Sequence, residues 1–116
     1  MSCVLRLSSP RLEEYLPRLV IQPYRVEAGT AHFQISICDF TNFSGQVIDA
    51  IAYLQKNGAD LNCAMSAPDA DGVLDFAVEL NSAAFQFNSF PATLVREAGN
   101  LGLALEISHY PGDRTL

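Results

Sequence analysis

Thiol and imidazole groups are the side chains in this sequence that could carry out nucleophilic chemistry. Cys38 and His32 fall on one expected strand, and a catalytic cysteine needs a base within hydrogen-bonding reach. At about 3.3 Å per residue they lie about 20 Å apart along a strand, so they cannot form a catalytic pair by themselves. His109 could still approach either of them across a sheet. We expect structural histidines and an unreactive thiol, with an enzyme built on Cys38 and a histidine as an alternative.

Carboxylates are the second group whose arrangement could support chemistry. Asp75, Glu79 and Glu106 can point to one face of a sheet, where paired carboxylates could act as acid and base, but their spacing does not bring them together. The chain has no glycine-rich phosphate loop, no Gly-x-Ser-x-Gly motif and no His-Glu-x-x-His motif. We therefore predict a non-enzymatic protein with no catalytic residue and no cofactor.

The run Asp69-Ala70-Asp71-Gly72 looks like part of a calcium loop. An EF-hand would also need an acidic residue at position 67 and a glutamate at position 78, where the chain has Ala67 and Val78. The three cysteines are 25 or more residues apart and form no Cys-x-x-Cys pair, so they indicate neither a zinc site nor a disulfide framework. We expect no metal site.

The charge of the chain is uneven along its length. The formal net charge is −6; residues 1–25 carry a net +2, whereas residues 39–79 carry seven acidic residues against Lys56 alone. This balance argues against nucleic-acid binding and favours a basic protein partner, although carboxylates can also simply keep a domain in solution. The residues predicted to bind the partner are Asp39, Asp60, Asp69, Asp71, Asp75 and Glu79.

Length and composition predict one domain over residues 1–116, with 49% hydrophobic residues to build its core. No charge-free stretch approaches the about 18 apolar residues that a membrane span requires. The first residues lack the pattern of a signal peptide. We expect a cytoplasmic protein with no membrane partner.

Hydrophobic periodicity places the secondary structure. Residues 4–7 alternate as a strand, Pro10 can open a short helix that ends near Leu16, and residues 21–28 and 31–38 form a hairpin in which 31, 33, 35 and 37 point inward. The clearest helix follows residues 41–44 and ends at Asn57-Gly58. The remaining expected elements are a loop over 59–72, strands over 74–80, 85–87 and 103–107, and a helix opened by 89–91.

The resulting order is β-α-β-β-α-β-β-α-β, and its first six elements match the ferredoxin-like arrangement. We predict an α+β domain with a ferredoxin-like core extended by β-α-β. Its mixed or antiparallel sheet would have about six strands, with three helices on one face. The other face would be partly polar and free for a partner, with side chains drawn from His32, Gln34, Ser36, Asp75, Glu79 and Glu106.

Phenylalanines are concentrated at the entries to the second and third expected helices. Phe40 and Phe43 precede the second helix, and Phe85, Phe87 and Phe90 precede the third. A phenylalanine-rich core accounts for most of them, and the alternative is an exposed aromatic anchor beside acidic side chains.

Residues 90–111 have a leucine-rich helix, a Leu-Gly-Leu step and an Ile-Ser-x-Tyr strand, and Phe43-Ser44-Gly45-Gln46 precedes Asp49-Ala50-Ile51. Over about residues 39–111 this resembles small uncharacterised bacterial proteins related to the family called domain of unknown function 4279. The resemblance implies a bacterial origin and a small α+β domain, with no catalytic residues to carry over.

These observations give two main functional hypotheses. The first is a bacterial immunity protein that neutralises a basic toxin by direct binding, since acidic single-domain proteins of this size often have that role. The second is a small-ligand sensor or a self-associating scaffold, for which a homodimer formed by edge-to-edge pairing of sheets is one form.

Overall fold

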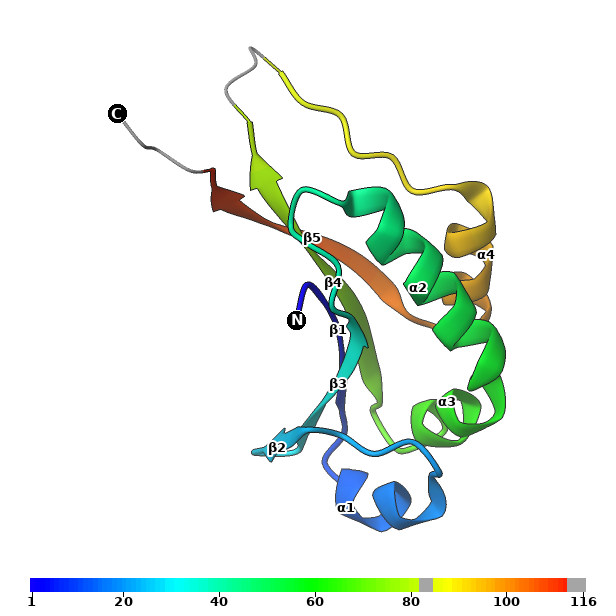
Figure 1. Ribbon diagram of the computed structural model, residues 1–116. Helices are drawn as coiled ribbons and strands as arrows, with labels where there is room; N and C mark the ends of the chain where they lie inside the picture. Colours follow the sequence, from blue (N-terminus) through cyan, green and yellow to red (C-terminus); the bar gives the residue numbers. More distant parts are fainter. Residues whose placement is uncertain (82–84, 113–116) are drawn as a thin grey trace.

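Figure 1 shows the computed structural model, in which residues 1–81 and 85–112 are described. Their five strands form one sheet in the order β2-β3-β1-β4-β5. Neighbouring strands are antiparallel except β4 and β5, which are parallel. The strands are β1 (Cys3–Ser8), β2 (Arg25–Glu27), β3 (Thr30–Ser36), β4 (Asp71–Leu80) and β5 (Ala104–Pro111).

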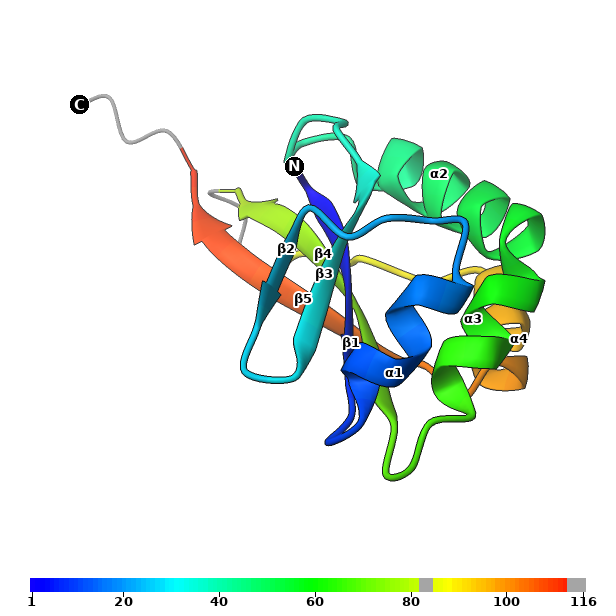
Figure 2. The same cartoon turned by 90° about the horizontal axis from the view of Figure 1, so that it is seen from below.

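The helices lie on one side of this sheet and leave the other side uncovered (Figure 1). At both ends the sheet curves away from the helical layer. Figure 2 shows α1 and α3 side by side at one end of the strands, which agrees with the contacts between them. The helices are α1 (Leu12–Tyr15), the 3-10 turn η1 (Leu16–Arg18), α2 (Phe43–Lys56), α3 (Gly58–Met65) and α4 (Ala92–Asn100). In the described part of the chain, no helix has the length and apolarity needed to cross a membrane.

The α+β class predicted from the sequence is confirmed, but the detailed layout is different. The described residues form five strands where about six were expected, and four α-helices where three were expected. The ferredoxin-like arrangement therefore holds only in part. An additional helix, α3, precedes β4, and residues 85–87, which were expected to form a sixth strand, do not form one.

Helix α3 occupies residues that were expected to form a loop. Gly58 suggested the end of α2, but Asn57 serves both helices: its N–H donates to Tyr53, and its carbonyl accepts from the N–H of Leu61. Asp60 lies in the first turn of α3, where a negative charge is favourable. With only two buried side chains, Leu61 and Ala64, the helix is too short to show a clear period.

Residues 85–87 follow β4 without forming a strand. The side chain of Gln86 replaces backbone pairing here: its amide nitrogen donates to the carbonyl of Glu79 (3.1 Å), and its oxygen accepts from the N–H of Asn81 (2.9 Å). A hydrophobic alternation does not predict such a side-chain bond, which explains the wrong expectation.

The hairpin between β2 and β3 forms as predicted. Ala28 and Gly29 at its tip have φ values of 49° and 80°, the left-handed pair that a two-residue type I′ turn requires. Asp69 has a φ of 51° and follows Pro68 in a turn closed by the N–H of Ala70 and the carbonyl of Ala67. This arrangement is typical of a type II turn, and it starts β4.

The core lies between the sheet and the helices. Phe43, Phe76 and Phe90 form its aromatic centre, with ring centroids 5.1 to 5.8 Å apart. Of the five phenylalanines that precede the second and third expected helices, Phe43 and Phe90 therefore have the predicted core role. Gln46 of α2 is fully buried and donates to the carbonyl of Ala77 at 2.7 Å. This bond fixes α2 against β4.

Candidate functional site

The uncovered side of the sheet, called the open face below, carries charged side chains from four of the five described strands. Strand register and alternation place on it the side chains that lie opposite the core positions. Among residues 1–81 and 85–112, its charged members are two arginines against five carboxylates. They are Arg6, Arg25, Glu27, Asp71, Asp75, Glu79 and Glu106, and His32, Gln34 and Ser108 lie among them.

Arg6 is at the centre of the open face and joins two strands. Its guanidinium donates to Asp75 at 2.9 Å and to Glu106 at 3.0 Å, and Ser108 donates its hydroxyl to Asp75 at 2.7 Å. These hydrogen bonds raise the pKa of Arg6 further, so its charge is permanent. Because Arg6 bridges Asp75 and Glu106, the two carboxylates do not form an acid and base pair.

A line of carboxylates follows β4 along the open face. Asp71, Asp75 and Glu79 are four residues apart from one another, so they share one side of the strand at spacings of about 13 Å. The sequence predicted that Asp75 and Glu79 would share a face with His32 and Gln34, and the strand register agrees. Such spacing suits contacts with several cationic groups of a large partner.

The other three carboxylates predicted to bind a partner lie outside this line. Asp69 is exposed in the turn before β4. Asp39 follows β3 and accepts from the N–H and hydroxyl of Thr41, hydrogen bonds that lower its pKa. Asp60 belongs to α3, where its carboxylate accepts from the N–H groups of Val20 and Ile21. The structure therefore gives Asp60 a role in holding the segment after η1, away from the open face.

One end of the open face leads into a hollow of about 420 Å³, called the apical hollow below. Ile37 and Met1 are exposed beside it, and the ring of Phe40 packs against Tyr110 with centroids 5.1 Å apart. The hollow therefore combines apolar side chains with two carboxylates. Its lining residues are Met1, Ile37, Cys38, Asp39, Phe40, Glu79 and Pro111.

The end of β3 differs from the sequence prediction at two residues, Ser36 and Ile37. A register shift opposite Cys3 and Val4 leaves Ile35 as an extra residue in β3, so that Ile35 and Ser36 are both buried and Ser36 is not on the open face. The strand then ends, and Ile37, which was expected in the core, is 76% exposed. The sequence shows no signal for this irregularity.

Two further phenylalanines are exposed near this end. Phe85 and Phe87 are 72% and 82% exposed, and their rings contact each other edge to face with centroids 5.3 Å apart. The alternative of an exposed aromatic anchor therefore fits the exposure of Phe85 and Phe87, but not Phe43 and Phe90, which are partly buried and pack against the core.

The thiol of Cys38 belongs to a hydrogen-bonded group without an imidazole. It donates to Asp49 at 3.4 Å, and Ser36 donates its hydroxyl to the same carboxylate oxygen at 2.6 Å. His32 instead packs against Tyr24 on the open face, with ring centroids 6.0 Å apart, and His109 lies on the opposite face of the sheet. Because a carboxylate offers no positive charge to a thiolate, this geometry does not activate Cys38 as a nucleophile.

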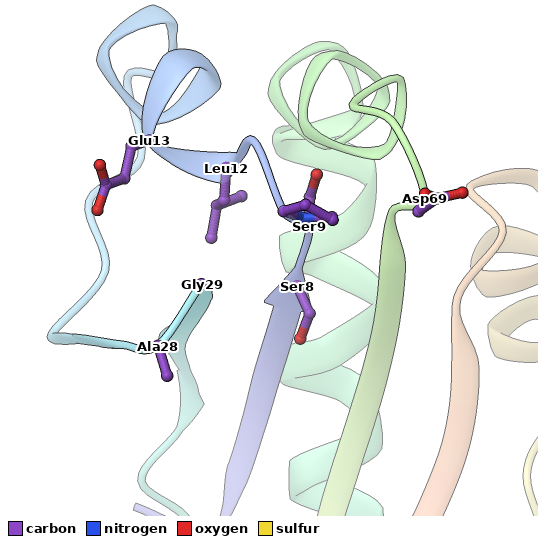
Figure 3. Close-up of a pocket in the computed structure, with 8 residues that line it drawn as sticks. Ser8, Ser9, Leu12, Glu13, Ala28, Gly29 and Asp69 are labelled. Atoms are coloured by element: carbon purple, nitrogen blue, oxygen red, sulfur yellow. The ribbon is translucent and has the colours of Figure 1, made fainter.

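A second hollow of about 510 Å³ lies at the other end of the strands (Figure 3). The carboxylates of Glu13 and Asp69 stand on opposite sides of it and point away from each other. Ser9 donates its hydroxyl to the carbonyl of Pro68, and the hydroxyl of Ser8 pairs with Thr30. Both hydroxyls therefore already have partners within the chain, and the two carboxylates point apart, which does not favour a site for a small polar ligand.

Among the described residues, no group of three or more histidine, cysteine or acidic side chains is arranged to hold a metal ion. Comparison with protein-family models, with curated proteins and with solved structures finds no match for the chain. The resemblance to domain of unknown function 4279 therefore stays a prediction.

Proposed function

We propose that this chain is a non-enzymatic binding protein whose open face and apical hollow bind a basic protein. In its specific form, the proposal is that the chain is a bacterial immunity protein and that the basic partner is the toxin it neutralises. The observation that carries the proposal is a sheet face without helical cover on which, in the described part of the chain, five carboxylates outnumber two arginines. A partner with lysines and arginines spaced like these carboxylates would be complementary to it in charge.

The apical hollow supports a protein partner rather than a free cation or small ligand. Affinity between proteins is concentrated in a few apolar or aromatic anchors surrounded by polar contacts. The exposed Ile37 and the partly buried Phe40 provide apolar side chains for such contacts, and Asp39 and Glu79 line the same hollow. Electrostatic attraction along β4 would guide encounter, and the hollow would hold an apolar side chain of the partner.

A charge-neutralising variant tests the electrostatic half of the proposal. D71N/D75N/E79Q removes three negative charges from the open face, and E13Q/E14Q/E97Q removes three from the helical side of the molecule as a matched control. Affinity capture from the lysate of the source organism, with both variants and the wild type as bait, identifies the partner. The purified partner is then titrated by calorimetry at low and high salt.

The proposal expects a basic partner whose affinity falls in high salt and falls at least about tenfold in the open-face variant, since each close charge pair is worth about 1.5 kcal/mol or more. The helix-side control should bind as the wild type does. Equal binding by all three proteins, or an acidic partner, would overturn the electrostatic proposal.

The hollow is tested separately by I37S, with I48S as its control, because Ile37 and Ile48 are both exposed isoleucines. We expect I37S alone to weaken binding to the same purified partner. The immunity role requires one more result: co-expression of the wild type must relieve the growth inhibition caused by the partner, and D71N/D75N/E79Q must not. A partner that causes no growth inhibition would reduce the proposal to binding without neutralisation.

A further inference from the structure

The two edges of the sheet are unlike each other. At one edge, β2 has three residues, and its exposed Arg25 and Glu27 form an ion pair at 2.6 Å. At the other edge, β5 has eight residues, and within residues 1–81 and 85–112 no strand pairs with its outer side. Natural proteins shorten or charge their edge strands to prevent pairing with other chains. The edge at β2 has this protection, whereas the longer edge at β5 has a proline only at its last residue, Pro111.

Burial along β5 shows that its outer side is open. Leu105 and Ile107 point to the helical side, as Leu5 and Leu74 do on inner strands. The two inner leucines are fully buried, whereas Leu105 and Ile107 are only partly buried. β5 has no lysine or arginine, and its single carboxylate, Glu106, is already paired with Arg6.

Helix α4 extends this open surface above the strand. Glu97 faces α2, where it accepts a hydrogen bond from Gln55. At 100° per residue, the side of α4 turned away from α2 carries Ala92, Val95 and Gly99. This flank has no charge, and Val95 is 49% exposed.

We propose that β5 pairs antiparallel with β5 of a second copy of this chain, around a twofold axis perpendicular to the sheet. An axis at Ile107 places Leu105 opposite His109 and Glu106 opposite Ser108 of the other copy. In this register each pair shares a face, and no like charges are opposed. The sheet then continues from one copy into the next, and the partly buried side chains of the edge become covered.

The second copy is favoured over a foreign strand because it supplies both missing contacts at once. The same axis that pairs the strands brings the uncharged flank of α4 toward its counterpart in the other copy. A self-complementary patch of this kind is what a twofold dimer requires. The pairing leaves the open face free, so it is independent of the proposed binding of a basic protein.

Light scattering during size-exclusion chromatography of the purified chain tests the dimer. At about 100 µM the wild type should have twice the 12.6 kDa mass of one chain. V95K places a charge on the α4 flank, where the exposed side chain loses no packing in the monomer, and should raise the dimer dissociation constant at least about tenfold. I107K should do the same by opposing two lysines at the axis.

Two matched variants serve as controls. V26K puts the same charge on the other edge strand, and I48K puts it on an exposed position of α2; both should remain dimeric. A 12.6 kDa wild type, or a dimer that persists in V95K and is lost in V26K, would overturn the proposal. Hydrogen exchange gives a second readout: dilution should accelerate exchange in β5 but not in β2.

Discussion

The two faces of the sheet consist of alternate residues of the same strands, and the molecule uses them differently. Leu5 of β1 is fully buried beneath the helices, while its neighbour Arg6 makes ion pairs on the uncovered side. Burial of apolar area supplies most of the free energy of folding, whereas exposed ion pairs supply little. The open face can therefore vary to fit a partner at less cost to the fold than the covered face.

The largest difference between the faces should follow truncation of Phe76. This side chain is fully buried between the rings of Phe43 and Phe90, so Phe76→Ala should lower the free energy of unfolding by about 3–5 kcal/mol. Urea denaturation followed by circular dichroism measures it. Phe87→Ala is the control, because Phe87 is exposed, and it should change stability by less than about 0.5 kcal/mol. Similar losses in both variants would contradict the comparison.

An intermediate effect is expected on the open face for Arg6→Met. The substitution keeps an unbranched side chain close in length to the aliphatic part of arginine but leaves Asp75, only 16% exposed, without its cation, so stability should fall by about 1–2 kcal/mol. The same measurement on Arg25→Met, whose ion pair with Glu27 is exposed, should show no measurable change. The distinction between a central and a peripheral ion pair would be lost if both variants behaved alike.

The smallest effect concerns His32. Partial burial, followed by the positive charges of Arg25 and Arg6, lowers its pKa. Because the pKa of His32 is lower in the folded chain, the unfolded chain binds its proton more tightly. The stability associated with neutral His32 is therefore fully present above about pH 6.5 and is lost as the pH falls through the lowered pKa. The urea midpoint should therefore drop more for the wild type than for His32→Gln between about pH 7.5 and about pH 5. Parallel pH profiles would mean that the protonation of His32 is not linked to folding.

The sequence predicted those parts of the fold that rest on local pattern. The hairpin turn at Ala28-Gly29 and the helix α2 follow from turn chemistry and from a regular apolar period. Helix α3 and the exposed Ile37 were missed, because one depends on a shared residue between two helices and the other on a shift between paired strands.

The candidate site was predictable to a similar extent. Alternation alone placed Asp75 and Glu79 on one face, because the period of two is local to β4. The ion pairs of Arg6 join residues 69 and 100 positions apart, and only the order of the strands brings them together. The role of Asp60 in accepting backbone N–H groups was likewise invisible, since composition does not distinguish a structural carboxylate from a free one.

The position of β1 between β3 and β4 has a consequence for how the chain is made. β1 is synthesised first, but one of its two neighbours consists of residues 71–80. At about 5–20 residues per second, the ribosome delivers that neighbour several seconds later. During this interval β1 can pair with β3 on one side only, and its other side stays unpaired until residues 71–80 have been made.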